Sequence, residues 1–358
     1  MANTVISAAQ LYSDILVKEP FIKSKFMILG DNSKFQFPLF GSKVLYRNVT
    51  AGNTAEYDPD LGFQNLQGTM GSATWEETEA SFDRTVVAKS DTIAEANAVL
   101  QGMKLSTPEI ISRTFAKIGT EIDAVTCSTI YNSIEASNKK TVADLPVDKD
   151  NIIGTLTKIN SMMINAEHDG AYFIFMASSV YANLQDAMVA NHIFGNQTSV
   201  VSFTGRDIFA GEDIDGLEAK IDVVKWGTNA YIIVVPDERM VTGVTLYDGK
   251  TEGQTAGGWV KATDAKAVKL VVCNPEAVAV AARHIVNNMT VPLVLANLIG
   301  DDINVELEGL AKIYNGAVQV NNIGVDQNYD CVRFMGRLVY SPVVFDGLKG
   351  QIFTVTEA

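Results

Sequence analysis

One long amphipathic segment, residues 106–137, constrains the fold of this chain more than any other feature. Its apolar residues recur at steps of three and four: Ile111, Phe115, Ile118, Ile122 and Val125. This spacing predicts a single helix with one buried face. At a rise of about 1.5 Å per residue the helix would span roughly 45 Å, which is long for a globular domain. We therefore expect a helix that braces the whole molecule.

The opposite face of this helix carries charged residues in pairs. Glu109 and Arg113 are four residues apart, as are Lys117 and Glu121. Such pairs stabilise a helix surface only modestly. We interpret them as a solvated face and not as a functional site.

The composition limits the classes of function. The chain has 358 residues, of which 47% are hydrophobic, enough for one large core or two coupled ones. Its net charge of −14 and the absence of a basic patch argue against a protein that binds nucleic acid by neutralising phosphates. The N-terminus lacks the basic flank and apolar core of a secretory signal, and no apolar run is long enough for a membrane span.

The three cysteines are isolated in the sequence. Cys127, Cys273 and Cys331 form no CxxC pair, and their number is odd. This pattern favours a reducing compartment and buried, unpaired thiols over a disulfide framework or a zinc site.

The first hundred residues predict two protruding parts. Residues 1–40 form an apolar arm with little periodicity, which is too short to bury its own phenylalanines and should lie on the body or on a neighbouring subunit. In residues 41–104, two strand-like limbs, 43–49 and 75–89, flank a segment rich in glycine. The second limb carries too much charge for a central strand, so we expect an extended β-hairpin that projects into solvent or onto a partner.

Helices and strands alternate after the long helix. Asp148 or Asp150 can cap a second helix, which is followed by an apolar strand at 171–176 and a short helix capped by Ser178 or Ser179. Further strands are expected at 217–224, 230–235, 241–247 and 268–273 and within 305–356, whereas 277–285 fits either a helix or a strand. The glycine-rich stretch 248–258 is predicted to be a loop.

None of the motifs for catalysis or metal binding is complete. Residues 243–251 imitate a phosphate-binding loop but have five residues between the glycines where four are required. Residues 326–337 begin like a calcium loop but have Cys331 in place of its glycine and Arg337 in place of its glutamate. No metal-ligand spacing is formed by the three histidines, His168, His192 and His284. We therefore expect no catalytic, cofactor-binding or metal-binding residues, and no enzyme activity.

The order of these parts resembles the major capsid proteins of tailed bacteriophages, whose Johnson fold is also used by encapsulin shells. The resemblance is carried by residues 75–93 leading into 107–131, by 172–184 and by 216–236. The first stretch places Ile122-Asp123 in mid-helix, as in the spine helix of the family. The second is similar to the family's strand followed by a helix of the form apolar-Tyr-x-x-Leu.

The resemblance implies an α+β fold with four parts. These are an N-terminal arm (1–40), an extended β-hairpin loop (41–104), a peripheral domain with the spine helix (105–165 and 330–358) and an axial domain (166–329). It also implies a structural protein that self-assembles through hexamers and pentamers into an icosahedral shell around double-stranded phage DNA. Some members crosslink a loop lysine to an asparagine, but no motif assigns that role to Lys89.

The implied partners are further copies of the chain, together with scaffolding, portal or decoration proteins. DNA would be enclosed without sequence-specific binding, and no membrane would be involved. The implied location is the virion capsid, assembled in the cytoplasm of the host bacterium. Because the sequence begins directly at the arm, we expect either a separate scaffold or a leader that has been removed.

Three other functions stay open on sequence alone. The same fold serves an encapsulin-type compartment, which packages a cargo enzyme. A cytoplasmic two-domain enzyme could use residues distant in sequence, for instance Cys273 with His284, and would have a deep pocket around a perturbed cysteine. A phage tail or adhesin component is disfavoured by the long helix and the absence of repeats.

Overall fold

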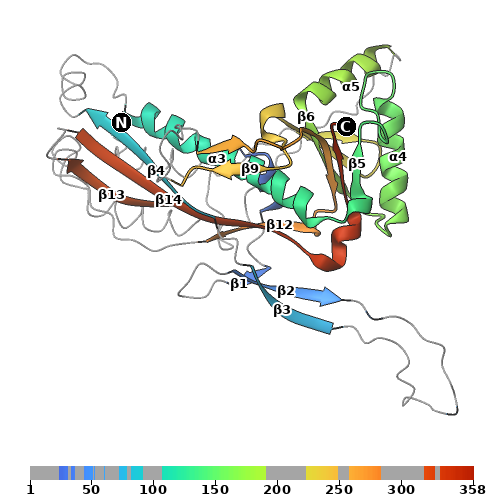
Figure 1. The fold of residues 1–358 in the computed structure, drawn as a ribbon, viewed down its shortest axis with the longest axis horizontal. Coiled ribbons are helices and arrows are strands. Elements are labelled where there is room, and N and C mark those ends of the chain that lie inside the picture. The colour runs from blue at the N-terminus through green and yellow to red at the C-terminus, as the bar shows by residue number, and fades with distance from the viewer. Residues whose placement is uncertain are drawn as a thin grey trace, which may run out of the picture.

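The computed structural model describes residues 24–30, 34–36, 44–50, 52, 60, 72–78, 82–91, 107–190, 223–248, 258–283, 318–326 and 331–358. The predicted long helix is α3 (Thr107–Ser133), which crosses the molecule diagonally (Figure 1). After α3 the chain continues in the short 3-10 helix η3 (Ala136–Asn138), so the helix ends earlier than predicted.

The predicted core face of α3 is confirmed where its side chains are described. Ile118, Ile122 and Val125 are all buried. The predicted solvated face is only partly right: Lys117 is exposed, but Glu121 is buried. Arg84 on a neighbouring strand accounts for this difference, because it pairs with the Glu121 carboxylate.

A six-stranded sheet forms the centre of the body. Its strands, in order across the sheet, are β5 (Lys139–Thr141), β15 (Ile352–Thr356), β11 (Val268–Cys273), β6 (Tyr172–Ala177), β8 (Ala230–Val235) and β7 (Val223–Trp226). The β5–β15 and β6–β8 pairs are parallel and the others antiparallel. Every residue of β6 and β15 is buried, which explains why β6 appears in the sequence as a continuous apolar run.

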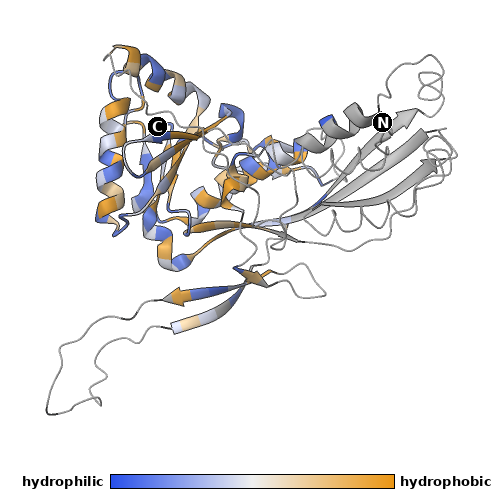
Figure 2. Cartoon of the chain, turned by 180° about the vertical axis from the view of Figure 1, so that it is seen from behind, coloured by the Kyte–Doolittle hydropathy of each residue, from blue (hydrophilic) through white to orange (hydrophobic). Residues whose placement is uncertain are grey.

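Two helices flank this sheet, α4 (Ile152–Asn165) and α5 (Ser178–Ala190). Seen from behind in Figure 2, the strands beside these helices are mainly hydrophobic, and the helices carry both hydrophobic and hydrophilic residues. The predicted apolar stripe of α4 is buried at Ile152, Leu156, Ile159 and Met163, but Ile164 is exposed.

The local caps of these helices differ from one another. Asp148 Oδ1 accepts hydrogen bonds from the amides of Asp150 and Asn151 in the turn before α4, whereas the N-cap residue itself is Asn151, whose side chain makes no capping hydrogen bond. The prediction of a serine cap for α5 is wrong. Asp237 Oδ1 accepts from both the Ser178 hydroxyl and the Ser179 amide, so the capping acceptor comes from the 3-10 helix η4 (Asp237–Arg239).

A second, elongated sheet extends away from the body (Figure 1). Its strands are β4 (Phe82–Asp91), β12 (Val278–Arg283), β13 (Val318–Asp326) and β14 (Cys331–Val344). β14 pairs antiparallel with β4 along one edge and with β13 and β12 along the other. The segment 277–285, for which the sequence allowed a helix or a strand, therefore forms strand β12 over residues 278–283. Residues 338–344 belong to the single long strand β14.

A three-stranded ribbon stands off the body (Figure 1). It consists of β1 (Phe35–Gln36), β2 (Val44–Thr50) and β3 (Ser72–Thr78), paired antiparallel in the order β1-β2-β3. The predicted limb 75–89 is thus divided, because β3 pairs with β2 whereas β4 pairs with β14. The intervening Glu79-Ala80-Ser81 contains no glycine or proline that would mark this break in the sequence.

The remaining described elements are short. Strands β9 (Val244–Leu246) and β10 (Trp259–Lys261) pair with each other, so only part of the predicted strand 241–247 forms a regular ladder. The 3-10 helices η1 (Phe26–Leu29) and η5 (Asp346–Gln351) complete the list. Arm residues 1–23, loop residues 249–257, His192 and His284 lie outside the described residues.

Candidate functional site

A buried aspartate in the middle of α3 anchors the N-terminal segment. Asp123 is fully buried, and its Oδ1 accepts hydrogen bonds from the Ser24 hydroxyl at 2.7 Å and from the amides of Lys25 and Phe26 at 2.8 and 3.0 Å. Its Oδ2 lies 3.0 Å from Arg239 Nη1. Burial raises the pKa of Asp123, and the Phe26 amide, the Ser24 hydroxyl and Arg239 oppose that shift.

The contacts of Asp123 fix the described segment 24–30 to the body. Directly beside Asp123, the Phe26 ring stacks on Phe175 of β6 with centroids 4.1 Å apart. The backbone of Gly30 then forms a bridge with Val280 of β12. The described segment 24–30 is therefore bound to a helix and two sheets that lie far from it in sequence.

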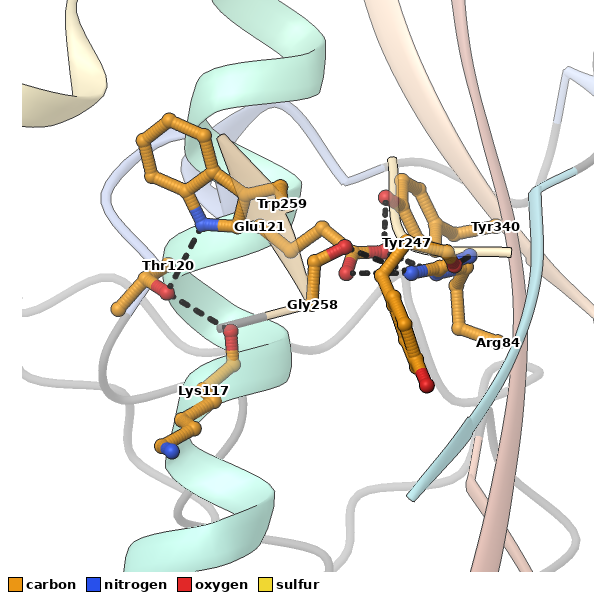
Figure 3. Close-up of polar contacts among 8 residues, drawn as sticks. All are labelled: Arg84, Lys117, Thr120, Glu121, Tyr247, Gly258, Trp259 and Tyr340. Atoms are coloured by element: carbon orange, nitrogen blue, oxygen red, sulfur yellow. Dashed lines mark hydrogen bonds and ion pairs between the residues drawn. The ribbon is translucent and has the colours of Figure 1, made fainter. Parts of the chain in front are cut away.

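A second buried carboxylate, Glu121, lies one half-turn from Asp123 on α3 and faces the elongated sheet. Arg84 Nε of β4 lies 2.6 Å from Glu121 Oε1, and the Tyr340 hydroxyl of β14 donates to the same oxygen at 3.1 Å (Figure 3). Burial raises the pKa of Glu121, and Arg84 and Tyr340 act against it. Burial also raises the pKa of Tyr340 well above its usual value, and the Glu121 charge adds to that shift.

Arg84 also holds the two chain ends of segment 248–257. Its Nη1 donates to the Tyr247 carbonyl and its Nη2 to the Gly258 carbonyl, both at 2.8 Å (Figure 3). Gly258 has a φ of +81°, and a Cβ at this position would lie 2.8 Å from Glu121 Oε2. Glycine is therefore required here by both the backbone conformation and the close approach of the carboxylate.

The base of the projecting ribbon rests on Phe345, which directly follows β14. Its ring contacts Phe35 at 6.3 Å and the edge of Tyr46 at 5.7 Å between centroids. A Cβ on Gly347 would lie 2.9 Å from the Val49 carbonyl, so η5 packs closely against β2.

Hydrogen bonds within the ribbon join its strands. The Tyr46 hydroxyl and the Asn48 side-chain amide of β2 donate to the two oxygens of Glu76 on β3, at 2.8 and 2.9 Å. Burial raises the pKa of Tyr46, with a further contribution from the hydrogen bond to Glu76. The ribbon is thus braced internally as well as at its base.

The cysteine singled out as a possible nucleophile lies in the core. Cys273 is fully buried in β11, and burial raises its pKa to about 12. Cys127 is equally buried in α3, with its pKa also raised by burial to about 12. Both described thiols are free, as predicted from the sequence. His168 is half-buried, its Nε2 lies 3.0 Å from the Ala171 carbonyl, and it is separated from Cys127 and Cys273 by many residues in the sequence.

The buried carboxylates Asp123 and Glu121 are bonded to protein partners. Among the described residues, no cluster of three or more histidine, cysteine, aspartate or glutamate side chains could hold a metal ion. In the same part of the chain, no helix is both long and apolar enough to cross a membrane. The buried polar contacts of α3 with the rest of the fold involve Asp123, Arg84, Tyr340 and Arg239. The sequence pointed to Asp123 by its place in mid-helix. It did not point to the other three, because their partners lie tens to hundreds of residues away.

No protein-family model and no curated protein sequence matches this chain. Solved structures do match it. The capsid structure of the cyanophage P-SCSP1u has a TM-score of 0.51 at 11% identity, and the match covers 92% of this chain and 86% of that chain. The chain has the phage capsid fold.

Two further structures are similar at lower TM-scores. A chain from Mycobacterium phage Ogopogo gives 0.48 at 12% identity, covering 90% of this chain and 89% of that chain. The SrpI encapsulin of Synechococcus elongatus PCC 7942 gives 0.47 at 9% identity, covering 89% and 83%. The α+β capsid fold expected from the sequence is confirmed by the match to the cyanophage P-SCSP1u capsid structure. Within this capsid fold, both buried carboxylates lie on the long helix, where they join it to the N-terminal segment and to the elongated sheet.

Proposed function

We propose that this chain is a structural major capsid protein that self-assembles through hexamers and pentamers into an icosahedral shell around double-stranded phage DNA. The observation that carries the proposal is the ribbon β1–β3, which stands off the body of a chain with a capsid fold (Figure 1). Because β1 pairs with β2 at only two positions, the rest of the ribbon is the two-stranded hairpin β2–β3, and such a hairpin has only marginal stability of its own in water. Contact with a neighbouring copy would bury it.

The anchoring contacts support the same proposal. Phe345 and Gly347 contact the ribbon at its base, and Asp123 holds the segment at Phe26 on the body. A protein that docks on copies of itself in a closed lattice needs protrusions held in fixed directions, because each contact is repeated by symmetry. Many weak contacts of this kind add up to a stable shell.

The division of the chain is part of the proposal. We assign residues 1–40 to an N-terminal arm, 41–104 to an extended loop, 105–165 and 330–358 to a peripheral domain, and 166–329 to an axial domain. Scaffolding, portal or decoration proteins would be the further partners. The net charge of −14 is consistent with a shell that encloses DNA without binding a particular sequence. The location would be the virion capsid, assembled in the host bacterial cytoplasm.

Negative-stain electron microscopy with light scattering on the same purified sample tests this proposal. Closed shells, or rings of five and six copies, are the expected result. The contents then separate the two shell functions, since a phage capsid encloses DNA and an encapsulin-type compartment encloses a cargo protein. A compact monomer or dimer that persists with scaffolding protein present would contradict the shell function.

A further inference from the structure

Arg84 joins three parts of the chain through a single guanidinium group. It contacts Glu121 of α3 through Nε and Nη2, the Tyr247 carbonyl through Nη1 and the Gly258 carbonyl through Nη2 (Figure 3). The Tyr247 amide also donates to the Gly258 carbonyl at 2.8 Å. The two ends of segment 248–257 are therefore closed against each other and held by a side chain from β4.

The planar guanidinium of Arg84 can donate to Glu121 and to both backbone carbonyls at once. A guanidinium presents several N–H donors in a fixed plane, whereas a lysine ammonium is a compact point charge that cannot reproduce that fork. The Arg84 side chain is only 17% exposed, and the Tyr340 hydroxyl orients its carboxylate partner. Small changes in the position of Arg84 therefore break several directed hydrogen bonds together.

Arg84 is also close in the chain to the projecting ribbon. The ribbon ends at Thr78 and β4 begins at Phe82, so only residues 79–81 lie between them. Four such steps span at most about 15 Å when fully extended, so the end of the ribbon and the start of β4 cannot move farther apart than that. Arg84 is the third residue of β4, and strand ends fray more readily than strand centres. A displacement of the ribbon therefore acts first on the part of β4 that carries Arg84.

We infer that Arg84 is a positioning residue that couples the projecting ribbon to segment 248–257, so that moving the ribbon loosens the closed ends of that segment. If the proposed shell function holds, a neighbouring copy seated on the ribbon would supply the displacement. The coupling itself is a property of the single subunit. It is therefore measurable on unassembled protein, whatever that protein goes on to form.

Hydrogen–deuterium exchange on unassembled protein tests the coupling. Gly347→Ala displaces the ribbon, because the added Cβ would lie 2.9 Å from the Val49 carbonyl. We expect faster exchange in the peptide with residues 44–50 and also, by about threefold or more, in the peptide with Tyr247. If Gly347→Ala leaves residues 44–50 unchanged, Tyr46→Ala supplies the displacement by removing the ring that packs on Phe345.

Two further variants separate coupling from general loosening. Insertion of Gly-Ser-Gly-Ser between Ala80 and Ser81 adds slack, so Gly347→Ala should then affect residues 44–50 but no longer Tyr247. Arg84→Gln and Arg84→Lys should each speed exchange at Tyr247 in a protein whose ribbon is unchanged. Lys158→Gln, on the exposed face of α4, is the control and should leave exchange at Tyr247 unchanged. The inference would be overturned if, in the protein with its native 79–81 linker, a ribbon variant speeds exchange in residues 44–50 but leaves exchange in the Tyr247 peptide unchanged.

Discussion

Asp123 accepts four hydrogen bonds or ion-pair contacts without any exposure to water. Three of its donors belong to the N-terminal segment, and the fourth is Arg239 of η4. Such a carboxylate is tolerated in the core because its charge and its lone pairs are matched by partners. The same matching makes its removal costly, since Arg239 and two backbone amides would lose their acceptor.

Asp123→Ala should therefore lower the free energy of unfolding by about 3–5 kcal/mol, the range for breaking a buried ion pair from one side. Urea unfolding followed by circular dichroism measures this loss. Asp264→Ala, which removes an exposed carboxylate, is the matched control and should stay within about 0.5 kcal/mol of the parent. Equal losses in the two variants would show that the contacts of Asp123 contribute nothing specific.

The buried thiols should resist modification in the native protein. Burial raises the pKa of both Cys127 and Cys273 to about 12, so at pH 8 each is an uncharged thiol, whereas thiol reagents attack the thiolate. In a Cys331→Ser background we expect no labelling by such a reagent in the native protein and two labels per chain in urea. Rapid native labelling of Cys273 would contradict its core position and would favour the enzyme alternative.

Among the elements, the ribbon depends on side chains at its base for its direction. Tyr46 serves twice, since its ring packs against Phe345 and its hydroxyl donates to Glu76. Tyr46→Ala should remove both contacts, leave the body folded and reduce the yield of assembled particles at least about tenfold, which corresponds to roughly 1.4 kcal/mol. Light scattering measures the yield. Tyr46→Phe keeps the ring and should assemble nearly normally, whereas equal yields for the alanine variant and the parent would show that ribbon direction is unimportant.

Local periodicity explains which elements could be predicted from the sequence. Helix α3, helix α4 and strand β6 carry their burial pattern in consecutive residues, and each is present. The division of limb 75–89 could not be predicted, because β4 finds its partner in β14, some 250 residues later in the chain. The cap of α5 was missed for the same reason, since Asp237 lies 59 residues beyond Ser178.

The contacts of Glu121 could not be predicted for the same reason, because its partners are distant in the sequence. A glutamate on a helix face is expected to be solvated unless a cation and a hydrogen-bond donor are brought to it. Arg84 and Tyr340 do so for Glu121, but they come from two other strands of the fold. Pairings across a fold leave no signal in the spacing of a single segment, so such a site emerges only with the tertiary structure.

At the scale of the whole molecule, the described chain has a body around the six-stranded sheet, an elongated sheet leading away from it and a ribbon standing off its base (Figure 1). The long helix α3 contacts β4 and β14 of the elongated sheet as well as η1 and η4, and so ties the elongated sheet to those two 3-10 helices. An arrangement with two protrusions leaves surface that the subunit does not bury by itself. Neighbouring copies in a shell would cover it.

Cryo-electron microscopy of the purified protein, assembled with scaffolding protein if required, tests this account most directly. We predict a closed icosahedral shell of pentamers and hexamers in which each β2–β3 ribbon lies on a neighbouring copy. A protein that forms no particle under these conditions, or a shell in which the ribbon folds back onto its own subunit, would contradict it.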